Sequence, residues 1–135
     1  MSDTPSLRPL AQKLGYTPGT RARLDGAPTP YPALAAGMPD GVVFLEDPDE
    51  EADLVHLFVM EETALRPALA AHLDRLAPRG ALWVSWPKKS ARTATTVTED
   101  TIRDAALPMG LVDVKVCAVD ATWSALKLVR RLSGH

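Results

Sequence analysis

The chain has 135 residues, of which 46% are hydrophobic and 24% charged. These values are close to the averages of globular proteins and exclude a chain that is disordered throughout. The length is typical of one domain with its own core, so we expect a single domain over residues 1–135, with an N-terminal arm at 1–19. The net charge of -2 argues against nucleic-acid binding, which normally requires a basic surface.

The cellular compartment follows from what the sequence lacks. A single cysteine, Cys117, cannot form an internal disulfide, which favours a reducing environment. The N-terminal residues show no signal-peptide pattern, and no apolar run reaches the roughly 18 residues that a membrane helix needs. We expect a cytoplasmic protein without membrane contact.

The first third of the chain carries weak secondary-structure signals. Residues 9–14 predict a short helix that ends at Gly15. Residues 20–25 predict a strand that ends in a turn beginning at Gly26. Residues 31–38 predict a second helix, bracketed by prolines near its start and after its end.

Two apolar runs follow in close succession. Residues 41–46 (GVVFLE) and 53–60 (DLVHLFVM) both predict strands, and the second is continuous enough to be buried on both faces of a parallel sheet. About six residues join them, whereas a parallel crossover usually takes a dozen or more. This spacing favours an antiparallel pair.

The remaining elements alternate between helix and strand. Leucines at three- and four-residue spacing predict a helix from the cap Thr63 to Ala77, and residues 81–86 (ALWVSW) predict the next strand. Thr98 caps a helix that ends at Gly110. Residues 111–119 and 124–131 predict two strands joined as a hairpin by 120–123.

This order predicts a small Rossmann-like α/β fold. We expect a mainly parallel sheet of about six strands, flanked by helices and closed by an antiparallel hairpin.

Residues 14–28 (LGYTPGTRARLDGAP) resemble the entry into the first strand of S-adenosylmethionine-dependent methyltransferases. The later order of helix, strand, helix and closing hairpin is also similar to the second half of that fold. Segments 9–19, 53–59, 81–89 and 106–131 resemble an uncharacterised bacterial family of domains of unknown function. That second resemblance spans nearly the whole chain and implies no activity.

The sequence departs from a methyltransferase at the place where the cofactor would bind. A cofactor loop needs closely spaced glycines so that backbone approaches the ligand. Here Gly26 is followed by Ala27 and Pro28. A typical methyltransferase also has another strand–helix unit before residues 53–60, for which this chain has no room. These departures argue against cofactor binding of the usual kind.

The residues at the carboxyl ends of the predicted strands are candidates for ligand binding. Gly26, Glu46, Asp47 and Met60 would hold an S-adenosylmethionine or nucleotide cofactor, with Glu46 or Asp47 accepting hydrogen bonds from a ribose. The alternative is an ordinary acidic loop.

A second candidate site is the loop after Trp86. Lys88, Lys89 and Arg92 place three cations there, which suits a small anionic ligand such as a phosphate or carboxylate. Thr93, Thr95 and Thr96 add hydroxyl groups. The alternative is a solvated basic loop.

The histidines and the cysteine suggest no metal site. His56 lies in an apolar strand and is expected to be a hydrogen-bonded core residue, while His72 and His135 lie elsewhere in the sequence. Cys117 has apolar neighbours and is expected to be buried and inert.

The three tryptophans lie in or beside predicted strands. Trp83 and Trp86 should point to opposite faces of one strand, because side chains alternate along a strand. Trp123, at the hairpin, is expected to pack back against the domain.

Three functions remain open. The favoured hypothesis is a non-catalytic ligand-binding, regulatory or interaction domain on a degenerate methyltransferase-like scaffold. The alternatives are a compact methyltransferase-type enzyme or nucleotide binder, and an anion-sensing domain. The edge strand of the hairpin also makes a homo-oligomer a candidate assembly.

Overall fold

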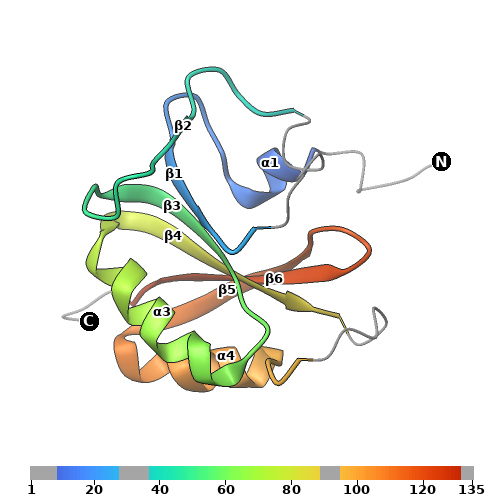
Figure 1. Cartoon of the computed structure of the whole chain (residues 1–135). Coiled ribbons are helices and arrows are strands. Elements are labelled where there is room, and N and C mark those ends of the chain that lie inside the picture. Colours follow the sequence, from blue (N-terminus) through green and yellow to red (C-terminus); the bar gives the residue numbers. More distant parts are fainter. Residues whose placement is uncertain (1–8, 28–36, 89–94, 132–135) are drawn as a thin grey trace.

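The computed structural model describes residues 9–27, 37–88 and 95–131, which form one six-stranded sheet with order β2-β1-β3-β4-β6-β5 (Figure 1). The neighbours β2, β1, β3 and β4 are parallel, whereas β6 is antiparallel to both β4 and β5. This confirms the predicted mainly parallel α/β fold closed by a hairpin. The strands are β1 (Arg21–Asp25), β2 (Val43–Phe44), β3 (Ala52–Phe58), β4 (Leu76–Pro87), β5 (Leu111–Ala118) and β6 (Trp123–Arg130).

Helices cover both faces of the sheet. Figure 1 shows α3 (Glu62–Asp74) and α4 (Glu99–Ala106) together on one face and the short α1 (Leu10–Leu14) on the other. Each face has its own apolar core. The larger core packs the leucines of α3 and the aliphatic residues of α4 against the sheet, and the smaller one packs α1 against Trp83. The predicted helix at 31–38 lies, apart from its last two residues, outside the described residues.

The helix starts differ in how well the sequence predicted them. Thr98 caps α4 as expected, its Oγ1 accepting a hydrogen bond of 3.2 Å from the Thr101 amide. The predicted Thr63 cap of α3 is wrong, because the helix begins after Glu61. The Glu62 amide donates instead to Thr96 Oγ1 at 2.6 Å. A residue far along the chain thus supplies the acceptor that a local side chain was expected to provide.

The antiparallel pairing expected for residues 41–46 and 53–60 is also wrong. Only Val43–Phe44 form β2, which pairs in parallel with β1, and β1 lies between β2 and β3. The connection therefore crosses β1 without a helix, through a segment that turns at residues 47–50. The buried Arg23 guanidinium holds it there by donating to the carbonyls of Asp47 at 2.8 Å and Glu50 at 2.5 Å.

The structure confirms the expectations for the three tryptophans, two on β4 and one on β6. Trp83 is fully buried in the core beside α1, whereas Trp86 packs against the core beneath α3 and α4. Trp123 packs its ring edge-on against Phe58, with the ring centroids 5.0 Å apart. The expectation of a buried Cys117 is wrong, since this side chain is only half-buried. It lies on β5, the edge strand of the sheet that the described residues form.

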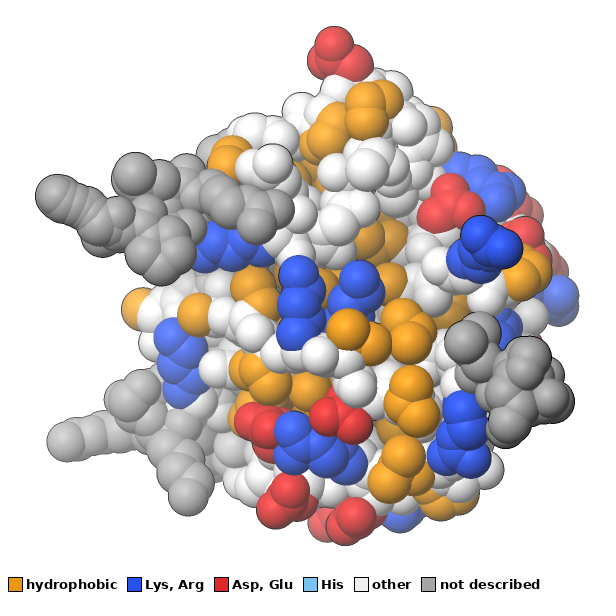
Figure 2. Space-filling view, turned by 180° about the vertical axis from the view of Figure 1, so that it is seen from behind, with side chains coloured by type: hydrophobic (Ala, Val, Ile, Leu, Met, Phe, Trp, Pro, Cys, Tyr) orange, Lys and Arg blue, Asp and Glu red, His pale blue; other side chains and the backbone are white. Residues whose placement is uncertain are grey.

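The surface mixes charges of both signs. Figure 2 shows Lys and Arg side chains across the middle of one face, hydrophobic side chains around them, and most acidic side chains towards the margins. Within the described residues, no helix is long and apolar enough to cross a membrane.

Candidate functional site

The strand order places a topological switch point at the carboxyl ends of β1 and β3. From β1 the chain moves to β2 on one side, and from β2 it returns to β3 on the other. Such a reversal is the switch point where open α/β sheets usually bind ligands. Gly26 directly follows β1, and Met60 lies two residues after β3. The fold therefore brings two of the four predicted cofactor residues, Gly26 and Met60, to the same end of the sheet.

Gly26 lies tightly against the end of β3. Its φ of +75° belongs to the left-handed region, and a Cβ at this position would be 2.9 Å from the Phe58 carbonyl oxygen. Only glycine combines this backbone angle with such a close approach. Gly26 thus allows the end of β1 to pack closely against the end of β3. In a methyltransferase, the loop at this place would approach the cofactor instead.

Glu46 and Asp47 lie on the crossover from β2 to β3. Both side chains are exposed, and Asp47 Oδ1 accepts the Asp49 amide at 2.9 Å. Asp49 forms an ion pair of 3.6 Å with Arg75, just after α3. Among the described residues, no hydrogen bond or ion pair links Glu46 or Asp47 to Gly26 or Met60. The acidic residues follow the crossover, and their role towards a ribose stays a prediction.

The threonines expected to serve an anion make internal contacts. Thr95 Oγ1 donates to the Met60 carbonyl at 2.8 Å and accepts from the Val97 amide at 3.1 Å. Thr96 Oγ1 accepts from the Glu62 amide. These hydroxyls tie the start of α3 to the segment before α4 and are engaged within the protein.

The cations of the same loop are only partly described. Lys88 is half-buried, and its backbone amide donates to the Thr122 carbonyl at 2.8 Å. Lys89 and Arg92, like Thr93, lie outside the described residues. The predicted anion site therefore stays a prediction.

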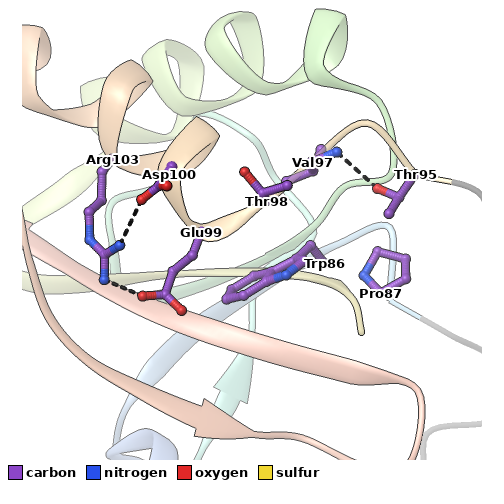
Figure 3. Close-up of a pocket in the computed structure, with 8 residues that line it drawn as sticks. All are labelled: Trp86, Pro87, Thr95, Val97, Thr98, Glu99, Asp100 and Arg103. Carbon is purple, nitrogen blue, oxygen red and sulfur yellow. Dashed lines mark hydrogen bonds and ion pairs between the residues drawn. The ribbon is translucent and has the colours of Figure 1, made fainter. Parts of the chain in front are cut away.

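A groove of about 570 Å³ lies between the end of β4 and the start of α4 (Figure 3). We call it the Trp86 groove. In Figure 3 the Trp86 ring and the Glu99 side chain face the same space. Its volume falls within the range typical of small-ligand sites, roughly 300–1,000 Å³. It is lined by Trp86, Pro87, Thr95, Val97, Thr98, Glu99, Asp100 and Arg103.

Three carboxylates surround one guanidinium at the α4 side of this groove. Arg103 pairs with Glu99, with Asp100 at 3.3 Å and with Asp113 of β5 at 3.0 Å. Hydrogen bonds to Asp113 and Glu99 raise the pKa of Arg103, and the bond from Arg103 lowers the pKa of Asp113. This cluster was not among the sites expected from the sequence. The four-residue spacing of Glu99 and Arg103 was an available signal, but no local pattern indicates Asp113.

The two described histidines contact different partners. His56 is fully buried, as predicted, with Nε2 2.5 Å from Ser85 Oγ. Burial lowers the pKa of His56 to about 3, so its ring is neutral at physiological pH. His72 Nε2 lies 2.8 Å from Asp25 Oδ2 and joins α3 to the end of β1.

A known family matches most of this chain. The family described as "Protein of unknown function (DUF3052)" matches residues 36–132. No curated protein matches the sequence.

Several solved structures of methyltransferases share the fold. The N-methyltransferase NodS from Bradyrhizobium japonicum WM9 aligns with a TM-score of 0.57 and 13% identity, over 91% of each chain. Magnesium protoporphyrin IX methyltransferase (ChlM) from Synechocystis PCC 6803 with bound SAH gives 0.57 and 14%, over 84% of this chain and 74% of that one. The ribosomal protein L11 methylase from Lactobacillus delbrueckii subsp. bulgaricus gives 0.55 and 12%, over 91% and 76%. At these identities the likeness establishes the fold alone.

Proposed function

We propose that this chain, which belongs to the family Protein of unknown function (DUF3052), is a non-catalytic domain that binds a ligand or partner on a methyltransferase-like scaffold. The main support for the proposal is the close packing of Gly26 against the Phe58 carbonyl. An S-adenosylmethionine would need a glycine-rich loop at this point, with backbone amides turned to the ligand. The residues present do not fit that requirement, because one glycine is used in packing and Pro28 contributes no amide donor.

The short crossover supports the same proposal. Residues 45–51 connect β2 to β3 directly, in the place where a typical methyltransferase would have a further strand–helix unit. Arg23 fixes this segment through two backbone carbonyls. A ligand at the switch point would therefore meet fewer loops than in a complete methyltransferase fold.

The alternative proposal is a compact binder of S-adenosylmethionine or another nucleotide. The presence of bound SAH in the ChlM structure, which shares the fold, favours it. The ligand would then lie among Gly26, Glu46, Asp47 and Met60. In that case adenosine-containing ligands at millimolar concentration would raise the melting temperature of the protein, because a ligand that binds only the native state stabilises it.

Calorimetric titration separates the two proposals. We expect S-adenosylmethionine and S-adenosylhomocysteine to give no saturable heat with the full chain, while an active methyltransferase titrated in parallel binds both. Circular dichroism on the same sample verifies that the protein is folded. Saturable binding of either compound would overturn the non-catalytic proposal.

A further inference from the structure

The Trp86 groove combines an apolar wall with an acidic rim. Trp86 is half-buried and presents its indole to the groove, and the buried Pro87 and Val97 complete the apolar part. Glu99 and Asp100 form the rim (Figure 3). We infer that this groove binds an arginine-bearing segment of a partner protein, a recognition role that rests on the proposed binding function and specifies its partner.

The charge of the rim selects the sign of the ligand. Among the described residues, three carboxylates against one guanidinium leave an excess of two negative charges around Arg103. The Asp100 side chain is 90% exposed, so one carboxylate faces solvent with room for a second cation. An incoming anion would meet uncompensated carboxylates, and Arg103 is already paired.

The aromatic wall selects arginine among cations. A guanidinium is flat, stacks on an indole and donates hydrogen bonds to a carboxylate in the same plane. Trp86 and Glu99 line the same groove, which places a stacking surface beside an acceptor. A lysine ammonium has no flat face to stack on the indole, so it would interact with the groove only through its charge.

The neighbouring edge strand favours a peptide segment over a free small cation. β5, which supplies Asp113, also exposes Val114 and Val116, at 53% and 48%. A bound segment would place its arginine in the groove and cover apolar surface on this strand.

An NMR titration of the full chain tests the inference, with acetylated and amidated tetra-arginine as the probe. The three tryptophans give three indole N–H signals, and a Trp86→Phe variant assigns the one of interest. We expect tetra-arginine to shift the Trp86 signal saturably, with little effect on Trp83 and Trp123. Tetralysine should bind more weakly and tetraglutamate not at all. An unmoved Trp86 signal, or a shift by tetraglutamate, would overturn the inference.

Two neighbouring acids on α4 provide a matched pair of variants. Asp100 lines the groove, whereas Asp104 is exposed on the same helix and does not line it. Asp100→Asn should weaken tetra-arginine binding about two- to fivefold, the range for one exposed charge pair, and Asp104→Asn should leave it nearly unchanged. Equal weakening by both variants would indicate only general attraction to an acidic surface and would contradict a specific site.

The two proposals fail in different ways. Binding of S-adenosylmethionine would overturn the non-catalytic role without moving the Trp86 signal of the peptide titration. Loss of peptide binding would overturn the arginine inference and leave the result of the S-adenosylmethionine titration unchanged.

Discussion

Single side chains that donate hydrogen bonds hold the two faces of the sheet in place. Trp83 Nε1 donates to the Leu14 carbonyl at 2.8 Å and so ties α1 to β4. Arg130 donates to the carbonyls of Leu73, Leu76 and Ala77, just where α3 passes into β4. Buried polar groups need such partners because an unmade hydrogen bond in the core costs the full desolvation of the group.

His56 predicts an acid-sensitive stability. Its pKa is about 3 in the native protein and near 6.5 in the unfolded chain, so below pH 6.5 the unfolded state binds a proton that the native state excludes. The free energy of unfolding should therefore fall as the pH drops, by about 2 kcal/mol between pH 7.5 and 5 from this residue alone. Urea unfolding at several pH values measures the loss.

A glutamine variant isolates the contribution of His56. His56→Gln cannot take up the proton and should lose this part of the pH dependence, whereas His72→Gln should retain it. Parallel curves for the wild-type protein and His56→Gln would show that His56 does not control the acid response.

At the scale of elements, the crossover from β2 to β3 is the feature that departs most from the expected order. It has no helix and carries acidic residues, and its carbonyls at positions 47 and 50 accept from Arg23. Leu45 packs against the larger core, and its amide donates to the Ala22 carbonyl at 2.7 Å. One arginine and one leucine thus perform the anchoring that a crossover helix performs elsewhere.

Replacing Arg23 by methionine should destabilise the protein by about 3 kcal/mol, because two hydrogen bonds from a charged donor are lost and the carbonyls lose their partner. Arg21→Met serves as the control. Arg21 is exposed and pairs with Asp53 at 3.2 Å, so its loss should cost less than about 1 kcal/mol. Urea unfolding at neutral pH compares the two. Equal losses would contradict an anchoring role for Arg23.

At the scale of the whole molecule, the sheet has two unlike edges. β2 has two residues, whereas β5 has eight and exposes Val114 and Val116. An irregularity between Asp113 and Lys115 interrupts the pairing of β5 with β6. The longer edge is where the sequence predicted self-association, and a homo-oligomer stays a prediction.

We predict that two copies of the chain form a dimer by pairing along β5. Val116→Lys should shift the mass measured by light scattering from dimer towards monomer, since a lysine on an edge strand opposes pairing with another strand. Val43→Lys changes an equally exposed valine on the opposite edge and should leave the mass unchanged. A monomeric wild-type protein at about 100 µM, well above the Kd of a micromolar dimer, would contradict the forecast.

The candidate sites were predictable only in part. The strand ends with Gly26 and Met60 were predictable, because a strand that stops at a glycine or a polar turn marks its own end. The engagement of Thr95 and Thr96 was not, because their partners lie more than thirty residues earlier in the chain. The Trp86 groove was not predictable for the same reason, since β4, α4 and β5 each supply part of its surroundings.

By itself, the sequence determined where most helices and strands lie and that they build a mainly parallel α/β sheet, because periodicity and caps act between near neighbours. Only the tertiary structure decided that β2 runs parallel on the far side of β1. Only the tertiary structure also brought Asp113 to Arg103. Both depend on contacts between segments that are distant in the sequence. The energies of these contacts come from burial and from strand pairing across the sheet, which local sequence patterns do not indicate.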